Sequence, residues 1–245
     1  MVIISHRGTE KGQVENSLSS FKHLLDNGIK HFEIDVRLSR DNVPLVIHDN
    51  LLLRLTKKVR FVSNLTLTEL RQLQLKSGEK IATLEEVLDF FKRHHATVFI
   101  DVKKSRVKSA KLICRQVVKT VSYFKINTYF ISFNDEVLDC LANESDYPVL
   151  KIIWFINRQM IIDRRVKRNK LSDYSHLSGF VIDYGADYVL PHFEKNDRQL
   201  LILGSRARIS KTNFSKFLHK NVFGIMRNNA LDFKKNCAVN LNLLQ

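Results

Sequence analysis

The sequence predicts an α/β fold, a single (β/α)8 barrel of the TIM type with a parallel strand core. Three observations favour it: the chain has 245 residues, short apolar β-rich runs recur along its whole length, and helical stretches separate most of them. Glycine (8) and proline (3) are scarce, and no repeat, linker or low-complexity tract is found. We therefore expect residues 1–245 to form one domain.

The expected strands are short runs of apolar and β-branched residues. They are Val2–Ser5, His31–Val36, Pro44–His48, Thr97–Val102, Thr128–Ser132, Val149–Trp154, Gly179–Asp183, Leu200–Gly204 and Val222–Met226. Apolar residues at helical spacing predict helices at Ser17–Asn27, Leu84–Arg93 and Ser105–Tyr123. Thr66 starts a further short helix, and the sequence Thr83–Glu86 forms a capping box. So many strand–helix units favour a closed barrel over an open sheet.

The chain is strongly basic, with 40 Lys and Arg against 25 Asp and Glu and a net charge of +15. Such a charge attracts anions: nucleic acid, acidic lipid headgroups or phosphorylated substrates. The ordinary alternative is a lysine-rich composition with a solvated basic surface. The densest clusters, Lys103–Arg115 and Arg158–Lys170, contain no recognisable nucleic-acid motif. We expect no specific nucleic-acid partner and keep an anionic membrane surface as a candidate partner.

The N-terminus and the cysteines indicate a compartment. The chain shows neither a signal peptide nor an apolar run long enough to span a membrane. Its cysteines, Cys114, Cys140 and Cys237, are odd in number and widely spaced, which favours free thiols over a disulfide framework. We expect a cytoplasmic protein, with peripheral association at membranes left open.

Polar residues gather where the first predicted strands end. They are His6 and Arg7, Glu33 and Asp35, His48, and Asp101 and Lys103. Residues i and i+2 of a strand share one face. The side chains of Glu33 and Asp35 are therefore expected on one face of their strand, and those of Asp101 and Lys103 on one face of theirs. The carboxyl ends of parallel barrel strands open at one rim, where active sites form. These side chains are therefore expected to converge.

The residue types fit phosphodiester chemistry. Three carboxylates, from Glu33, Asp35 and Asp101, can hold one Mg²⁺ or Ca²⁺. The ion and a lysine would neutralise a phosphodiester, two histidines can serve as general acid and base, and an arginine can donate to phosphate oxygens. Each residue alone also has an ordinary explanation, such as a solvated face or a loop histidine. Their presence together at successive strand ends argues against that explanation.

With these motifs the sequence resembles the glycerophosphodiester phosphodiesterase family. The matching elements are His6-Arg7-Gly8, Glu15-Asn16-Ser17, Glu33-Ile34-Asp35-Val36-Arg37-Leu38-Ser39, Asp41, Val43-Pro44-Leu45-Val46-Ile47-His48-Asp49, Arg54 and Thr83-Leu84-Glu85-Glu86-Val87-Leu88. Their order and close spacing make the match specific. The later part of the chain matches only in the rhythm of its elements.

The resemblance implies a TIM-type barrel, one divalent metal ion, and hydrolysis of glycerophosphodiesters to glycerol 3-phosphate and an alcohol. It also implies roles for individual residues. Glu33, Asp35 and Asp101 would bind the metal, His6 and His48 would form the acid/base pair in either order, Arg7 and Lys103 would bind the substrate phosphate, Glu15 would support the site or contact the metal, and Asn16 would brace the loop.

Two departures from the family pattern leave alternatives open. Asp101 stands where the family usually has Glu, which is similar to the sphingomyelinase D-like phospholipases. A lysophospholipase D or sphingomyelinase D-like enzyme, acting on lipids and releasing a cyclic phosphate, is therefore a second interpretation. The family's late Trp-Thr pattern would fall near Leu203-Gly204-Ser205, which has no Trp, and its closing motif is weak at Gly224–Asn228. These departures in the later part of the chain leave a third interpretation, an inactive barrel that binds phospholipid or nucleic acid.

Overall fold

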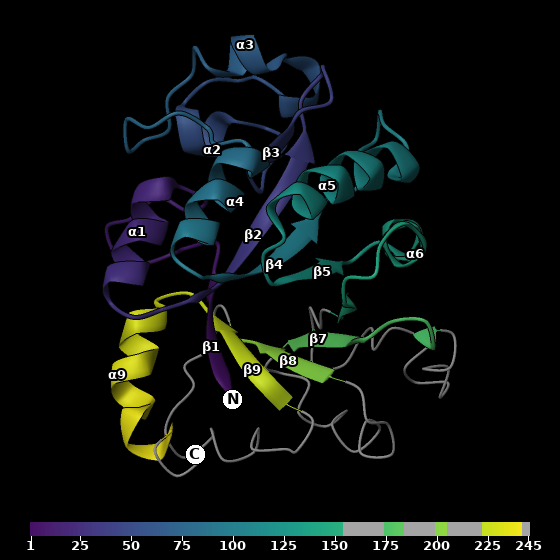
Figure 1. The fold of residues 1–245 in the computed structure, drawn as a ribbon. Helices are drawn as coiled ribbons and strands as arrows, with labels where there is room; N and C mark the ends of the chain where they lie inside the picture. Colours follow the sequence, from purple (N-terminus) through teal and green to yellow (C-terminus); the bar gives the residue numbers. More distant parts are fainter. Residues whose placement is uncertain (154–173, 184–198, 205–221, 242–245) are drawn as a thin grey trace, which may run out of the picture.

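The fold is a closed parallel barrel, seen here in a computed structural model that describes residues 1–153, 174–183, 199–204 and 222–241 (Figure 1). The barrel strands are β1 (Val2–His6), β2 (His31–Leu38), β4 (Thr97–Val102), β5 (Thr128–Ser132), β6 (Val149–Ile153), β7 (Gly179–Asp183), β8 (Gln199–Leu203) and β9 (Val222–Arg227). Each pairs in parallel with the next, and β9 pairs back to β1, so the ring has no free edge. The predicted TIM-type barrel is confirmed.

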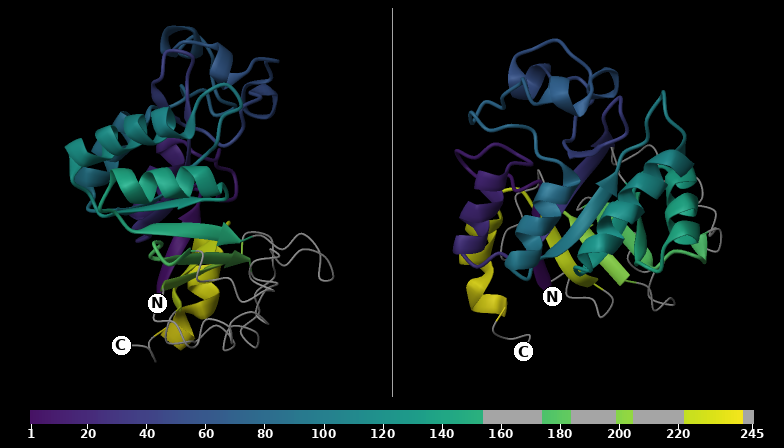
Figure 2. Two further views of the ribbon diagram at one scale, coloured as in Figure 1. Left: turned by 90° about the vertical axis from the view of Figure 1, so that its right-hand side faces the viewer. Right: turned by 45° about the horizontal axis from the view of Figure 1, so that its top comes forward.

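Helices cover the outside of the barrel, as parallel strands require of their crossover connections. They are α1 (Leu18–Asp26), α4 (Leu84–Arg93), α5 (Ala110–Phe124), α6 (Asp135–Glu144) and α9 (Ala230–Leu241). The two views of Figure 2 show α4, α5 and α6 against the strands and α9 beside β1 and β9. Four of the helices start at a side-chain cap, provided by Ser17, Thr83, Ser109 and Asn134.

Apolar side chains fill the layer between strands and helices and also the barrel interior. Between the layers, the rings of Phe21, Phe32 and Phe91 pack with centroids 4.8–5.6 Å apart. Inside the barrel, Phe99 and Met226 belong to a separate buried cluster. Each such side chain contributes roughly 1.5–3 kcal/mol by its burial. Because the interior is packed, polar chemistry is left to the rim.

The third predicted strand is not part of the barrel ring. Residues Pro44–Val46 form β3, which runs antiparallel to β2, with Val36 opposite Val46 and Leu38 opposite Pro44. The expectation that Pro44–His48 is a parallel strand of the barrel is therefore wrong, although His48 still reaches the pocket at the rim. Only a short turn separates β2 from β3, whereas a parallel partner needs a crossover of about a dozen residues or more. The chain thus rises above the rim along β2 and returns along β3.

An insertion follows β3 and has a small core of its own. It contains α2 (Leu53–Thr56), the short 3-10 helix η1 (Val62–Asn64) and α3 (Leu67–Leu70). Its buried side chains are Leu45, Ile47, Leu52, Leu55, Val62, Leu70, Leu75 and Ile81. Figures 1 and 2 show the insertion at the end of the barrel to which β2 and β4 point. It therefore stands beside the rim where strand-end side chains gather.

One predicted helix begins later in the chain than expected, and two predicted features lie outside the described residues. The helix expected at Ser105–Tyr123 begins only at Ala110, because Ser109 caps it and residues 103–108 form a loop on the rim. Trp154 and the basic cluster Arg158–Lys170 lie outside the described residues. Among the helices that the structure describes, none has the length and hydropathy needed to cross a bilayer.

Candidate active site

The His-Arg-Gly sequence forms a tight turn at the end of β1. Arg7 and Gly8 both have positive φ angles, +59° and +65°. The Arg7 amide donates to the carbonyl of Glu33 at 2.9 Å, which ties the turn to β2. A Cβ atom at Gly8 would lie 2.8 Å from the Phe21 ring of α1. Glycine is required here both by its backbone conformation and by the close approach of α1, and the turn directs His6 and Arg7 into the pocket.

Glu33, Asp35 and Asp101 lie together at the rim. Glu33 and Asp35 project from the same face of β2, and Asp101 is the direct neighbour of Asp35 on β4. All three are buried, and oxygen atoms of the three lie within 4.8 Å of one another. This placement agrees with the same-face spacing in the sequence.

Two cations partly neutralise the three carboxylates. Nζ of Lys103 lies 2.8 Å from Oδ1 of Asp35 and also contacts Oδ2 of Asp101. Nε of Arg7 lies 3.1 Å from Oδ2 of Asp35. Asp35 therefore has two cationic neighbours. Within the described part of the chain, the Glu33 carboxylate accepts only the backbone amide of Arg7, at 3.0 Å, and it lies 3.8 Å from Nε2 of His6.

The pKa shifts reflect this uneven neutralisation. Burial raises the pKa of Glu33 well above its usual value, and the nearby Asp35 charge raises it further. Burial likewise raises the pKa of Asp101, against the opposing effect of Lys103. Burial also opposes ionisation of Asp35, but Lys103 and Arg7 outweigh it and hold the pKa of Asp35 below its usual range. The two cations, Arg7 and Lys103, therefore do not fully neutralise the three carboxylates.

The donor set fits a hard divalent cation. Oδ1 of Asp101 is buried and has no hydrogen-bond partner among the described residues. A buried carboxylate oxygen without a partner is costly unless a ligand satisfies it. Oxygen ligands lie about 2.0–2.6 Å from Mg²⁺ or Ca²⁺, so separations of up to 4.8 Å suit three ligands of one ion. Oxygen-only donors favour these ions over softer metals.

His6 is buried and held by a residue from the other end of the chain. Its Nδ1 lies 2.7 Å from Oδ1 of Asn228, which follows β9. Because the amide oxygen can only accept, Nδ1 carries the proton and Nε2 remains available in the pocket. Burial, assisted by the nearby charge of Arg7, lowers the pKa of His6 to about 4. The ring is therefore neutral at physiological pH.

His48 is oriented by a chain of charged groups that reaches across the pocket. Its Nδ1 lies 2.6 Å from Oδ1 of Asp49, and Oδ2 of Asp49 accepts from Nε of Arg54 at 2.6 Å. Arg54 also donates two hydrogen bonds, of 2.8 and 2.7 Å, to the carboxylate of Glu15. This network joins the insertion to the loop between β1 and α1, and it fixes both histidine and insertion against the rim.

Glu15 and Asn16 lie on the same loop but face different groups. Glu15 pairs with Arg54 and lies 3.7 Å from Nη1 of Arg7, outside the cluster of three carboxylates. Asn16 has a positive φ of +55°, and its Nδ2 donates to Oδ2 of Asp35 at 3.0 Å. Asn16 thus both shapes the loop and orients Asp35.

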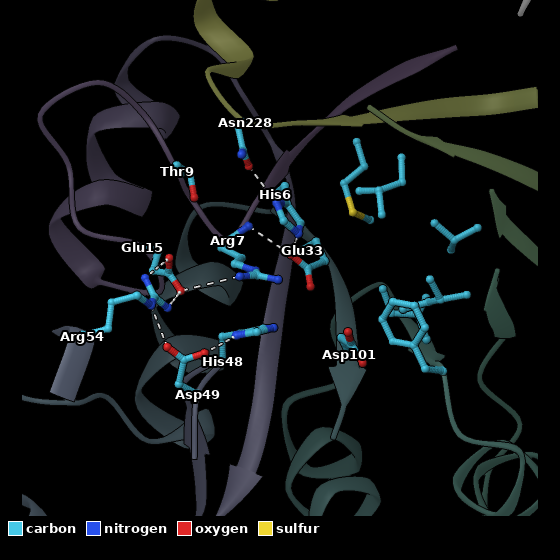
Figure 3. Close-up of a pocket in the computed structure, with 16 residues that line it drawn as sticks. His6, Arg7, Thr9, Glu15, Glu33, His48, Asp49, Arg54, Asp101 and Asn228 are labelled. Carbon is cyan, nitrogen blue, oxygen red and sulfur yellow. Dashed lines mark hydrogen bonds and ion pairs between the residues drawn. The ribbon is translucent and has the colours of Figure 1, made fainter. Parts of the chain in front are cut away.

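The pocket at the rim holds about 400 Å³ and has two unlike sides. Six of the side chains predicted for the site line the part formed by β1, β2, β4 and the insertion (Figure 3): His6, Arg7, Glu15, Glu33, His48 and Asp101. Asn16, Asp35 and Lys103 lie behind this lining and contact it through the carboxylate cluster. The opposite wall is formed by apolar residues of β5 to β9: Ile131, Ile152, Val181, Leu203 and Met226. The pocket therefore offers charged groups on one side and apolar contacts on the other.

Three residues of the site received no role from the sequence. Asp49 and Arg54 belong to the matching motifs. The position of Asp49 directly after His48 is the local signal that indicates a residue able to orient the histidine. Asn228 lies in the weakly matching closing segment. Nothing local to Asn228 indicates its contact with His6, which arises from closure of the barrel.

Comparison with known proteins agrees with this geometry. The sequence profile of the glycerophosphoryl diester phosphodiesterase family matches residues 6–160. A glycerophosphodiester phosphodiesterase of Caldanaerobacter subterraneus is 35% identical over 113 residues, which cover 43% of this chain and 46% of the relative. Human glycerophosphodiester phosphodiesterase 1 is 28% identical over 144 residues, 55% of this chain and 43% of the relative. The chain thus spans less than half the length of these curated relatives.

A solved structure extends the similarity over the whole fold. An Oleispira antarctica phosphodiesterase, solved in complex with its product sn-glycerol-3-phosphate, superposes with a TM-score of 0.81 at 20% identity, covering 97% of both chains. Fold and rim residues define a parallel (β/α)8 barrel with an oxygen-rich site at its carboxyl end. The chain belongs to the glycerophosphoryl diester phosphodiesterase family.

Proposed function

We propose that the protein is a metal-dependent phosphodiesterase that hydrolyses glycerophosphodiesters to glycerol 3-phosphate and an alcohol. The observation that carries this proposal is the buried cluster of Glu33, Asp35 and Asp101, of which Glu33 and Asp101 line one pocket together with His6 and His48. Membership of the family supports the same chemistry.

In this proposal Glu33, Asp35 and Asp101 hold one Mg²⁺ or Ca²⁺. A bound ion would neutralise charge on the phosphate and polarise its P–O bonds. Arg7 and Lys103 lie against the same carboxylates and would donate to the phosphate oxygens that approach the cluster. Glu15 would act through Arg54, and Asn16 through Asp35, so neither needs to contact the substrate.

His6 and His48 are the proposed acid/base pair. Both rings are fixed at Nδ1, by Asn228 and by Asp49, which leaves both Nε2 atoms for proton transfer. One Nε2 would take the proton of the attacking water, and the other would give a proton to the departing alcohol oxygen. The network that holds His48 includes the insertion, so the insertion is needed for catalysis as well as for shape.

The runner-up is a lysophospholipase D or sphingomyelinase D-like activity. Asp101 in place of the family's usual Glu, and the apolar wall formed by residues such as Ile152 and Val181, favour it. In that reaction a hydroxyl of the substrate would attack the phosphorus, the headgroup alcohol would leave with a proton, and a cyclic phosphate would remain.

An assay panel decides between these activities. Purified protein would be incubated with glycerophosphocholine, glycerophosphoethanolamine and lysophosphatidylcholine, each with Mg²⁺, Ca²⁺ or EDTA, and the products followed by phosphorus NMR. We expect an open monoester from the glycerophosphodiesters, with no turnover in EDTA. A cyclic phosphate from the lysolipid would establish the runner-up instead. No turnover of any substrate with either ion would leave an inactive binding barrel.

A further inference from the structure

We propose that the protein docks on an anionic phospholipid membrane through a surface beside the pocket, termed here the docking rim. The docking rim consists of residues 50–64 of the insertion and residues 103–107 after β4. Figures 1 and 2 show that the insertion and the loop between β4 and α5 project from the same end of the barrel. This inference concerns binding and goes beyond the proposed chemistry.

Exposed apolar side chains are concentrated on the docking rim. Of the seven large apolar side chains that are exposed in the described part of the chain, five lie on it: Leu51, Leu53, Val59, Phe61 and Val107. Val59 and Val107 are 65% and 68% exposed, so neither contributes much to the fold. Single exposed apolar residues are common, but their gathering in two short segments indicates an interaction surface.

Positive charge is interleaved with these apolar residues, and negative charge is absent from both segments. No Asp or Glu occurs between Asp49 and Glu69 or between Asp101 and Asp135. In the described part of the chain, the exposed side chains of Lys57, Lys58 and Arg106 form no ion pair. Lysine and arginine next to exposed aliphatic side chains are the combination that binds an anionic bilayer surface, with the cations at headgroups and the apolar groups below.

A groove on the docking rim lies close to the candidate active site. It holds about 540 Å³, runs between the two segments and is lined by Lys103, Lys104 and Arg106 together with Leu51, Phe61 and Val107. Among the residues that the structure describes, no acidic side chain lines it. Lys103 also contacts Asp35 and Asp101, so the groove adjoins the carboxylate cluster. A lipid headgroup held in the groove would lie next to the pocket.

The composition of the surface favours a membrane over a nucleic acid. Single-stranded nucleic acids bind where basic grooves are combined with several aromatic rings on which bases stack. The docking rim has one exposed aromatic ring, Phe61, and otherwise exposes aliphatic chains such as Leu51, Val59 and Val107. Aliphatic chains offer little to a base but partition well into the upper acyl region of a bilayer.

The test is vesicle flotation with the full chain at low and high salt, using phosphatidylcholine vesicles with or without phosphatidylglycerol. One variant removes charge (Lys57→Glu, Lys58→Glu and Arg106→Glu), and another removes apolar surface (Phe61→Ser and Val107→Ser). The matched controls are Lys92→Glu and Tyr123→Ser, exposed residues in the last turns of α4 and α5, at the opposite end of the barrel.

We expect the wild type and both controls to float only with phosphatidylglycerol vesicles and to dissociate as salt rises. The charge variant should lose roughly tenfold or more in vesicle affinity, and the apolar variant should lose affinity at every salt concentration. The unfolding temperatures of the variants should equal that of the wild type, which shows that they are folded, and so should their turnover of soluble glycerophosphocholine.

Wild-type affinity in both docking-rim variants, or no flotation of the wild type at low salt, would overturn the proposal. Binding to single-stranded RNA in preference to vesicles, abolished by the same charge reversals, would assign the surface to nucleic acid instead. Flotation needs no turnover, so a protein inactive in the substrate panel can still support docking, and an active protein can still refute it.

Discussion

Asn228 accepts a hydrogen bond of 2.7 Å from His6, although the two residues are 222 positions apart in the chain. The contact exists because β9 closes the barrel against β1, with Arg227 opposite Ser5. The residues that follow this pair, His6 and Asn228, then stand at the same point of the rim. The orientation of a proposed catalytic histidine at the N-terminus therefore depends on a segment that matches the family weakly.

The Asn228 contact is expected to matter for the rate and little for folding. Asn228→Ala removes the acceptor that fixes the tautomer of His6, so kcat should fall roughly tenfold or more, while the unfolding temperature stays nearly unchanged. Asn228→Asp keeps an acceptor and adds a negative charge, which should raise the pKa of His6. Its pH–rate profile should shift to higher pH on the limb that His6 controls. If the wild type and Asn228→Asp have identical pH–rate profiles, then protonation of His6 does not control the rate.

Replacement of either histidine should abolish most of the turnover. His6→Ala and His48→Ala should each lower kcat by roughly 10²–10⁴-fold, because each removes one proton-transfer step. Metal affinity, measured by calorimetry, should remain nearly unchanged, since the three carboxylates are intact. His23→Ala, in the last turn of α1, is the control. Near-wild-type turnover in one of the two variants would remove that residue from the acid/base pair.

The carboxylate cluster should cost stability when no metal is bound. Glu33 is buried beside Asp35, and its pKa is raised, so its ionised form is disfavoured in the folded protein. Glu33→Gln removes this charge and should raise the unfolding temperature in EDTA, by roughly 2–4 °C for each 1 kcal/mol gained. Glu33→Gln also removes a proposed metal ligand, so the stabilisation that Mg²⁺ or Ca²⁺ gives the wild type should be absent from the variant. Thermal denaturation with increasing ion concentration measures this difference.

The sign of the pH dependence follows from the direction of the pKa shift. A folded pKa above the unfolded value means that the folded protein binds the proton more tightly, so ionisation of Glu33 destabilises the fold as pH rises. The gain from Glu33→Gln should be largest above the raised pKa and should disappear as pH falls towards the ordinary value of 4.5. A gain that grows on acidification would contradict a buried, uncompensated Glu33.

Arg54 should act through His48. Arg54→Ala breaks the link from Glu15 to Asp49, so kcat should fall roughly tenfold, with a smaller change in KM for a substrate whose phosphate Arg54 does not touch. Arg54→Lys should recover only part of the rate, because a lysine cannot form the paired hydrogen bonds to Glu15. Arg60→Ala, which alters an exposed arginine of the same insertion, should leave turnover of a soluble substrate unchanged. Full activity in Arg54→Ala would show that His48 needs no support from the insertion.

The sequence by itself determined the barrel and the three carboxylates. Apolar runs with period-2 spacing fix which side chains share a face of a strand, so Glu33 and Asp35 share a face by that local rule. The alternation of strands and helices predicts the parallel barrel, whose common rim brings Asp101 to the same place. The capping box at Thr83 and the caps at Ser17 and Ser109 likewise depend on residues a few positions apart. Local patterns predict such features because the physics that produces them is local.

Only the tertiary structure decided which distant groups meet. His48 reaches the rim through a strand that runs antiparallel to the barrel, and Asn228 meets His6 through closure of the ring. The docking rim joins a segment of the insertion to the loop after β4, and the pairing of Glu15 with Arg54 links the loop after β1 to helix α2 of the insertion. These contacts depend on how packed elements are placed in space, and that placement is fixed by the whole core rather than by any short stretch of sequence.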